Sequence, residues 1–332
     1  MKRLLILCAP AALGWAIAAG AQSQDLTANR NSAFADTVPL TQVRDSYPSL
    51  SRDGTQLLFH SNRGGARAIW IAKGDGSQPR LLYDGGEEGE EPATPVWSPD
   101  GRSIAFAMRP AGAADADESD IYVMDADGSH VRRLTDAPGD DSHPHWSADG
   151  RRIFFNSPRG TPDPAAEWSR QHFGIYSVAA DGTGTTLHFL CDTVCTYPSP
   201  SPDSRRVVFR KVVNSPGFDW ELKDIARNSE VFVADIDGSN PRNLSNDPGF
   251  DGWPVWSPDG RWIAFSSNRA KVARTGQIFR IRPDGSGLEA LSDTLWSRVQ
   301  PSFAADHSLL VNEGREEAAV EISHIARIAP DD

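Results

Sequence analysis

Short runs of alternating apolar and polar residues recur along the 332-residue chain as one repeated unit. Each unit starts at a proline, passes through a turn that is most often Asp-Gly, and continues into an apolar run such as Ile-Ala-Phe. The six copies start at Pro48, Pro95, Pro144, Pro198, Pro254 and Pro301, spaced 47, 49, 54, 56 and 47 residues apart. Alternation with aromatic and β-branched residues between turn signals predicts antiparallel hairpins.

A second signature follows the first in each of five units. An apolar run leads into another Asp-Gly or Asp-x-Asp-Gly turn, with the runs starting at Ile69, Ile121, Ile175, Val231 and Ile278. A short apolar piece comes next, as in the stretches that end at Thr135, Ser245 and Ser292. Four short strands per unit, repeated six times at this period, predict an all-β fold, a six-bladed β-propeller.

The two ends of the chain complement each other. The sixth unit reaches its third strand from Ala319 and has no fourth, whereas residues 38–42 (VPLTQ) resemble the fourth strands of the other units. We expect this N-terminal strand to complete the last blade and close the ring, which removes exposed strand edges. The propeller is therefore predicted over residues 38–332, and residues 22–37 are predicted to be a flexible polar segment.

The start of the chain has the features of a secretory signal peptide. Lys2 and Arg3 precede an apolar run that ends in the small residues Ala19, Gly20 and Ala21, so residues 1–21 are predicted to be removed. A retained anchor is the alternative, but Pro10 and Gly14 interrupt a run that is short for a membrane span. We expect a periplasmic or secreted protein with no stable membrane insertion.

Charge excludes one class of partner. The formal net charge is −12, and it becomes −14 when the two cations Lys2 and Arg3 leave with the signal segment. Such a surface repels phosphate backbones, so nucleic acid is not an expected partner.

Removal of Cys8 leaves Cys191 and Cys195 in the stretch CDTVC, and an oxidising compartment favours a disulfide between them.

The repeat resembles that of the TolB propeller family. The shared features are the box PVWSPDGRSIAF from Pro95 or PVWSPDGRWIAF from Pro254 and the later turn DADGS or DIDGS. The resemblance covers about residues 38–330 and implies the fold. The family's separate α/β domain before the propeller has only residues 22–37 in its place here, so the complete TolB role is not implied. Similar propellers occur in tricorn-type proteases, in prolyl oligopeptidase-like peptidases and in some sugar-acid lyases; no G-x-S-x-G elbow of the peptidases is found in this sequence.

Strand order places a candidate site. The loops that enter each blade share one face of the ring with the loops between second and third strands. Six residues, each directly before a repeat proline, are therefore predicted to form the channel mouth: Tyr47, Thr94, His143, Tyr197, Trp253 and Gln300. The two longest loops on this face, from Ser157 and from Lys211, are expected to add contacts through Trp168, His172, Phe218 and Trp220. Carboxylates are expected around the mouth from Glu87, Glu88, Glu90, Glu91, Asp140 and Asp141.

Metal and catalytic chemistry have weaker signals. His143 and His145 could face one side of a strand and bind a metal with Asp141 or His172, although Pro144 disturbs the alternation. Hydrogen-bonded histidines are the competing interpretation and the favoured one, so no cofactor is expected. The Asp125–Gly128 and Asp235–Gly238 turns lack the further ligands of a calcium loop and are predicted to be hairpin turns. No nucleophile and base pair stands out.

The expected function is that of a protein-binding scaffold that grips an envelope or extracellular protein, or a peptide segment of one, at the channel mouth. The alternative is a carbohydrate-active lyase or hydrolase that uses a metal or a carboxylate pair there, with an oligosaccharide as ligand. In the box from Pro254, Trp256 is expected to pack between blades and Trp262 to lie at the surface. Trp253 is the tryptophan expected to touch a ligand.

Overall fold

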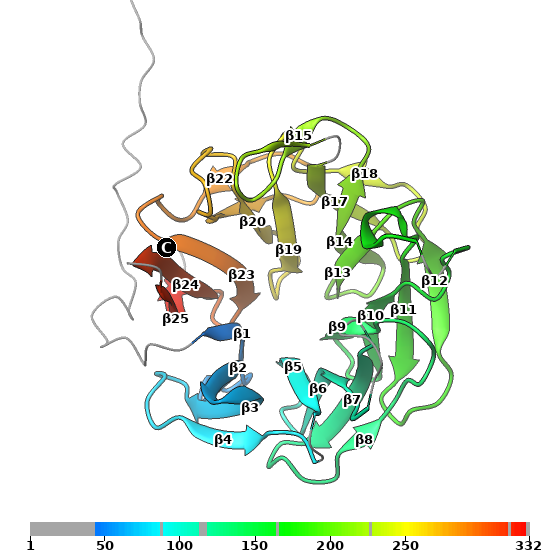
Figure 1. Ribbon diagram of the computed structural model, residues 1–332, viewed down its shortest axis with the longest axis vertical. Coiled ribbons are helices and arrows are strands. Elements are labelled where there is room, and N and C mark those ends of the chain that lie inside the picture. The colour runs from blue at the N-terminus through cyan, green and yellow to red at the C-terminus, as the bar shows by residue number, and fades with distance from the viewer. Residues whose placement is uncertain are drawn as a thin grey trace, which may run out of the picture. The chain divides into compact units, whose positions relative to one another are not determined.

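Six antiparallel sheets form the blades of a propeller in the computed structural model, which describes residues 44–329 except 87–88, 113–117, 164–165, 226–227 and 318–319. The described residues all belong to one compact unit. The sheets are arranged in a ring (Figure 1), and residues of their first strands line a central channel. The predicted signal segment, the polar segment and the expected closing strand at residues 38–42 lie outside the described residues. The predicted six-bladed fold is confirmed.

Each blade runs from the channel outward. The first strands, next to the channel, are β1 (Asp45–Leu50), β5 (Glu91–Trp97), β9 (Ser142–Trp146), β13 (Cys195–Pro200), β19 (Asp251–Trp256) and β23 (Ser297–Phe303). The second strands are β2 (Gln56–Gly64), β6 (Ser103–Arg109), β10 (Arg152–Ser157), β14 (Arg206–Val213), β20 (Ile263–Ser267) and β24 (Leu309–Glu317). We number the blades 1 to 6 in this order.

The third strands are β3 (Ala66–Lys73), β7 (Asp120–Asp125), β11 (Gly174–Ala179), β17 (Asn228–Asp235), β21 (Gln277–Ile281) and β25 (Val320–Ile328). The outermost strands are β4 (Arg80–Tyr83), β8 (Arg132–Arg133), β12 (Thr186–Leu190), β18 (Arg242–Asn243) and β22 (Glu289–Ala290). Within the described part of the chain the sixth sheet has three strands, and Arg44 forms a parallel bridge with Ser323 of β25.

The Asp-Gly sequences form the hairpin turns that the pattern predicts. In the turn after β7, Gly128 has a φ of +91°, a conformation that glycine adopts without strain. The Asp127 carboxylate accepts hydrogen bonds from the backbone N–H and the hydroxyl of Ser129 at 2.9 and 2.6 Å. The Asp127 Oδ1 atom therefore supports its own turn.

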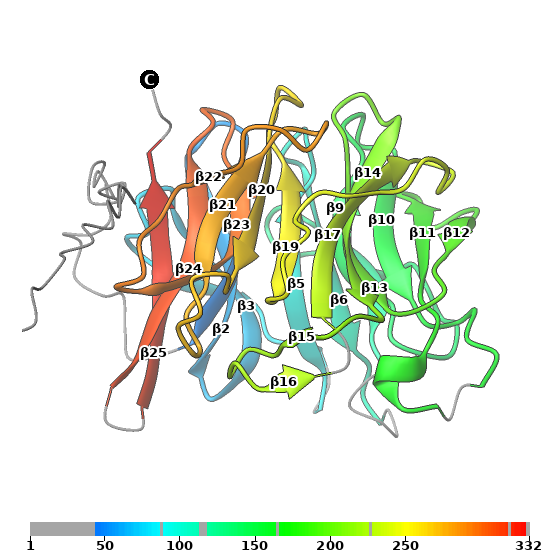
Figure 2. The same cartoon turned by 90° about the horizontal axis from the view of Figure 1, so that it is seen from above.

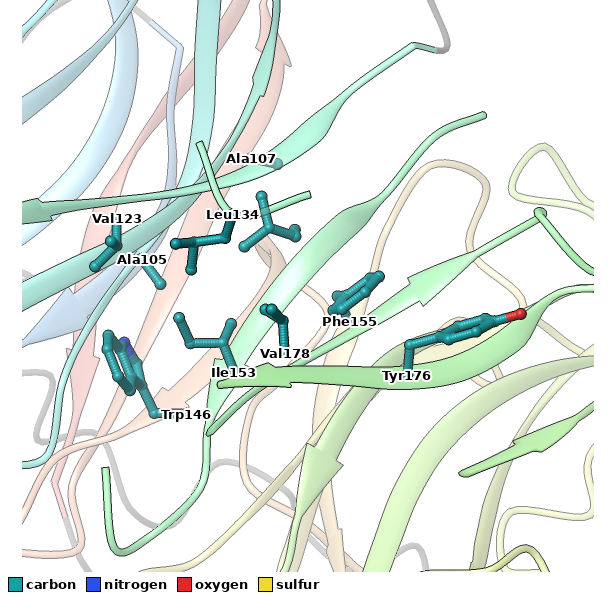
Figure 3. Packing of buried hydrophobic residues seen from close by; sticks show 10 residues of the cluster. Ala105, Ala107, Val123, Leu134, Trp146, Ile153, Phe155, Tyr176 and Val178 are labelled. Atoms are coloured by element: carbon teal, nitrogen blue, oxygen red, sulfur yellow. The ribbon is translucent and has the colours of Figure 1, made fainter. Parts of the chain in front are cut away.

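The core lies between neighbouring blades. Trp146 of blade 3 packs with Ala105, Val123 and Leu134 of blade 2, together with Ile153 of its own blade (Figure 3). The Trp146 indole N–H also donates to the Val96 carbonyl at 3.2 Å, which ties the two blades together. Trp256 occupies the same place between blades 4 and 5, so its predicted packing role is confirmed.

A buried ion pair recurs in three blades. Arg63, Arg159 and Arg269 each pair with an aspartate eighteen residues earlier, at or directly before the start of the first strand: Asp45, Asp141 and Asp251. Each arginine also donates from Nε to a serine two residues before it. In blade 4, Cys195 and Val213 stand at these positions, and Cys195 forms the predicted disulfide with Cys191.

Two excursions extend the face on which the chain enters the blades. A single 3-10 turn, η1 (Trp168–Arg170), lies between β10 and β11, and a small hairpin of β15 (Gly217–Phe218) and β16 (Asp224–Ile225) lies between β14 and β17. Figure 2 shows this hairpin at the lower end of the ring. Within the described ranges no helix is long and apolar enough to cross a bilayer.

Candidate functional site

The six residues of the predicted channel mouth occupy one repeated backbone position. Each lies inside the first strand of its blade, not in the entering loop as predicted, at a point where the pairing with the second strand shifts register. All six have a left-handed φ, between 49° and 57°. This conformation costs an L residue roughly 1–2 kcal/mol, so its occurrence at all six positions marks a strained feature built into the ring.

These residues converge on one central cavity. The cavity has a volume of about 120 Å³ and is lined by three consecutive residues from each blade: the mouth residue, the repeat proline and the residue after it. Sites for drug-sized ligands usually have roughly 300–1,000 Å³. The channel can therefore hold a side chain or a chain end, but not a whole oligosaccharide.

Four rings of the mouth touch each other. The His143 ring lies 3.8 Å from the Tyr197 ring and 6.3 Å from the Tyr47 ring, centroid to centroid. Tyr197 lies 5.8 Å from Trp253. The Tyr47 and Tyr197 hydroxyls share a hydrogen bond of 3.3 Å, and Gln300 Oε1 accepts from the Tyr47 N–H at 3.1 Å. The rings form a half-buried aromatic surface around the cavity.

Two polar atoms at the mouth are buried without a hydrogen bond of good geometry to any residue that the structure describes. They are the Thr94 hydroxyl and the Trp253 indole nitrogen. The indole lies near enough to the Tyr47 hydroxyl to lower the pKa of that group slightly, against the larger effect of burial. Buried polar groups are normally satisfied, so unmet ones in a cavity wall are available to a ligand or to water.

Residues of the second strands hold the mouth in place across blade boundaries. His60 Nδ1 accepts from the Thr94 N–H at 3.2 Å. Asn156 Oδ1 accepts from the Tyr197 N–H at 3.2 Å and lies 3.0 Å from His143 Nδ1. Since that oxygen can only accept, Nδ1 of His143 carries the proton, and its Nε2 is the acceptor nitrogen.

Burial controls ionisation at the mouth. Desolvation raises the pKa of Tyr47 well above its usual value, so its hydroxyl stays protonated. Desolvation lowers the pKa of His143 to about 4 and that of His60 to about 3. At neutral pH the mouth is therefore a surface of uncharged rings.

The histidine pair does not form a metal site with the proposed partners. His145 bonds to the Trp146 carbonyl through Nδ1 at 3.1 Å and to the Ser199 hydroxyl through Nε2 at 3.3 Å. Asp141 is fully buried in its ion pair with Arg159, and His172 lies half-buried in the loop before β11. Among the described residues, no three His, Cys, Asp or Glu side chains are grouped so that they could hold a metal ion.

The carboxylates predicted around the mouth, here called the acidic rim, are only partly found there. Glu87 and Glu88 lie outside the described residues. Glu91 pairs with Arg109 at 2.6 Å, and the Asp140 carboxylate accepts from the Ser142 hydroxyl at 2.8 Å. The predicted Asp141 carboxylate is inside the blade and is not part of the rim, because it neutralises Arg159.

The predicted loop contacts lie on two sides of Arg210 and Phe250. Trp168 is 43% exposed and its ring lies 5.7 Å from the Arg210 guanidinium. Trp220 meets the Phe250 ring edge-on at 6.0 Å, and Phe250 contacts Trp253 at 5.0 Å. Phe218 instead packs near Lys271, 5.8 Å from Nζ, and the His172 backbone N–H and carbonyl both bond to the Thr161 hydroxyl.

Sequence reasoning did not find Arg210 or Phe250. Arg210 lies on β14 and Phe250 directly before β19, and both join the loop aromatics to the channel mouth. The signal for Phe250 was an aromatic residue in an entering loop. The signal for Arg210 was a charged residue at a position where other blades carry His, Ala, Asn or Ser.

Comparison with known proteins agrees with this architecture. The family model of the TolB beta propeller domain (PD40) matches residues 88–226. The uncharacterized protein Atu1656 of Agrobacterium fabrum is 32% identical over 232 residues, which cover 60% of this chain and 75% of that protein. The chain spans between 19% and 46% of the length of the curated peptidase and TolB proteins that it also matches.

Solved structures share the fold at low identity. A putative TolB from Agrobacterium tumefaciens superposes with a TM-score of 0.63 at 20% identity, covering 86% of this chain and 91% of that one. An oligogalacturonate lyase in complex with manganese superposes with a TM-score of 0.56 at 14% identity, covering 89% and 92%. These likenesses concern the fold of the propeller.

Proposed function

Because the chain belongs to the TolB beta-propeller family, we propose that it is a binding propeller that grips an extended segment of an envelope or extracellular protein at its channel mouth. The observation that carries this proposal is the convergence of six strained, half-buried residues, one per blade, on one small cavity. Residues held in strained backbone conformations cluster at active sites and ligand-binding positions.

The size and chemistry of the cavity favour a protein segment. About 120 Å³ suits one side chain, and the rings of Tyr47, His143, Tyr197 and Trp253 offer it an apolar and aromatic wall. Rings of this kind, in a desolvated pocket, supply most of the free energy of protein–protein binding. A whole oligosaccharide does not fit in this volume, and six of the eighteen lining residues are prolines, whose side chains cannot form hydrogen bonds with a sugar.

The neighbouring loops enlarge the contact surface. Trp168 is exposed beside Arg210, Phe250 is half-buried between Arg210 and Trp253, and Trp220 is half-buried against Phe250. A segment that inserts one side chain into the cavity would lie across these rings. Aromatic anchors on long loops of a rigid scaffold are a common arrangement in recognition proteins.

Two features support a place of action outside the cytoplasm. The signal-like residues 1–21 and the disulfide between Cys191 and Cys195 both suit an oxidising compartment outside the cytoplasm. We infer a periplasmic or secreted protein with a protein ligand from the same compartment.

The test is affinity capture with variants on the two faces of the ring. Trp253→Ala combined with His143→Ala removes two of the four rings, and the captured partner, identified by mass spectrometry from the unchanged protein, should no longer be retained. Trp262→Ala is the matched control, because Trp262 stacks against Arg280 and Arg282 near the turn at the opposite end of blade 5. If the double variant retains the partner as well as the control does, the mouth is not the site.

The carbohydrate-active alternative remains a prediction. Turnover of acidic oligosaccharides by the purified protein, with and without a chelator, tests it directly. Elemental analysis of the same sample reports any bound metal.

A further inference from the structure

Arg210 lies beside the channel mouth between two aromatic rings. It stands on β14 opposite Thr196, the neighbour of the mouth residue Tyr197. Its guanidinium lies 5.7 Å from the centre of the Trp168 ring and 5.1 Å from that of Phe250. The two rings come from different loops, so three separate segments of the chain meet at this one cation.

The fold does not require an arginine here. At the same position of the second strand, blade 1 has His60 and blade 3 has Asn156, and each accepts the N–H of a mouth residue in the next blade. An arginine has no acceptor atom and cannot make that bond. Arg210 therefore replaces a structural hydrogen bond with a positive charge.

Blade 4 also lacks the aspartate that would neutralise an arginine. Blades 1, 3 and 5 carry a buried Asp–Arg pair, whereas blade 4 has Cys195 at the aspartate position, held in its disulfide, and Val213 at the arginine position. The arginine of blade 4 stands three residues earlier, nearer the mouth. Compared with those three blades, blade 4 therefore has its arginine nearer the channel and has no aspartate to pair with it.

The hydrogen bonds of Arg210 leave most of its donors unused. Nε donates to the Ser229 hydroxyl, and Nη1 donates to the Thr196 hydroxyl at a long 3.5 Å. A guanidinium has five N–H donors, so three of them have no protein acceptor in the part of the chain that the structure describes. No carboxylate pairs with Arg210 within those residues, although the protein as a whole is acidic, with a net charge of −12.

The packing around Gly252 leaves room for the Phe250 ring and the Arg210 side chain to lie side by side. A Cβ atom on Gly252 would lie 2.8 Å from the Phe250 ring and 3.4 Å from Arg210 Cδ. Glycine at this point therefore lets Phe250 fold over the strand and lets the arginine side chain pass beside it. The charge of Arg210 also acts on the mouth itself, since it contributes to the lowered pKa of His143.

We propose that Arg210 binds a carboxylate of the protein segment that occupies the channel mouth. The segment would place an apolar or aromatic side chain in the central cavity and an acidic side chain or its C-terminal carboxylate on the free guanidinium N–H groups. Charge-assisted bonds of this kind, made by a planar guanidinium, give both strength and orientation. This inference rests on the proposed function and names the chemistry of its ligand.

The experiment observes the Arg210 side chain directly. The Nε–H resonance of Arg210 in a ¹⁵N-labelled protein is assigned by its loss in Arg210→Gln, and the protein is titrated with four small probes. N-acetyl-phenylalanine carries a terminal carboxylate, N-acetyl-aspartyl-phenylalanine amide a side-chain carboxylate, N-acetyl-phenylalanine amide no charge, and glucuronate a sugar carboxylate. We expect one or both charged peptides to shift the resonance, the neutral amide to leave it in place, and binding to weaken as salt is raised.

Arg210→Gln should weaken binding of the charged peptide about tenfold or more. The control is Arg282→Gln, which removes an arginine that also stacks on a tryptophan, Trp262, but near the opposite end of the ring. It should leave the affinity unchanged. Thermal unfolding of both variants shows whether a loss of binding reflects a loss of folding.

Two results would overturn the inference. An equal response to the charged and neutral phenylalanine probes would show that Arg210 does not bind a carboxylate. A response to glucuronate alone would show that the ligand of Arg210 is a sugar acid and not a protein segment. Affinity capture separates this failure from that of the proposed function. If Arg210→Gln retains the partner that the Trp253 and His143 double variant loses, the mouth binds the partner and the carboxylate contact is wrong.

Discussion

The hydroxyl groups of Tyr47 and Tyr197, which come from blades 1 and 4 on opposite sides of the ring, share a hydrogen bond of 3.3 Å across the channel. Both residues have a left-handed φ, 54° and 57°, and both contact His143. The bond joins two blades that are not neighbours in the ring, as the contact between the Tyr47 and His143 rings also does. The bond therefore holds together two mouth residues that both have a strained backbone conformation.

The Tyr47–Tyr197 bond should be measurable as a coupling. Tyr47→Phe, Tyr197→Phe and the double substitution form a cycle in which each change removes a hydroxyl and keeps the ring. We expect each single variant to lose about 1 kcal/mol of stability in urea unfolding and the double variant to lose less than the sum. Strictly additive losses would show that the two hydroxyls do not interact in solution.

The buried ion pairs should contribute far more than surface pairs. Asp45 lies 2.6 Å from Arg63, and the two side chains are 1% and 7% exposed. Asp45→Ala leaves the guanidinium buried without its anion, and we expect a loss of about 3–5 kcal/mol in chemical unfolding.

A surface aspartate provides the comparison. Asp125 pairs with His130 at 2.8 Å, but both side chains are more than half exposed. Asp125→Ala should cost less than about 1 kcal/mol. Similar losses for the two variants would contradict the assignment of the repeated pair to the interior of the blade.

Acid should destabilise the protein partly through His143. Burial holds the pKa of folded His143 at about 4, below the ordinary value of 6.5. Between these values the unfolded chain binds a proton that the folded chain refuses, so stability falls as the pH drops from 6.5 toward 4.

His143→Asn removes this titration and keeps a residue that tolerates a positive φ. Between pH 7.5 and pH 5 the variant should lose about 1–2 kcal/mol less stability than the unchanged protein. His60 has its pKa lowered to about 3 by burial and is present in both proteins, so it cancels in the comparison. An equal loss in both would mean that His143 is not buried as a neutral ring.

Local patterns were sufficient to predict most of the fold. The repeat prolines, the Asp-Gly turns and the apolar runs predicted six blades and most of their strands, because hairpin signals act over a few residues. Trp256 could be assigned to packing, since its place recurs as Trp97 and Trp146. The disulfide between Cys191 and Cys195 followed from the cysteine count.

The features that decide the site depend on contacts between residues that are far apart in the sequence. The ion pair between Asp141 and Arg159 spans eighteen residues, and the sequence alone left Asp141 available as a metal ligand. The left-handed φ of the mouth residues accompanies a register shift in the first strand, and the residue types at these positions do not predict that shift. Arg210 can be recognised as a site residue only from its contacts with Trp168 and Phe250, which come from other parts of the chain.

Site-specific photocrosslinking tests the central claim most directly. A photoreactive benzoyl-phenylalanine replaces Gln300 at the mouth in one protein and Trp262 near the opposite end of the ring in another, and each is irradiated with the captured partner. We predict a crosslink from position 300 to one segment of the partner, none from position 262, and loss of the position-300 crosslink when Trp253→Ala is added. A crosslink from position 262 alone, or equal crosslinks from both positions, would contradict binding at the channel mouth.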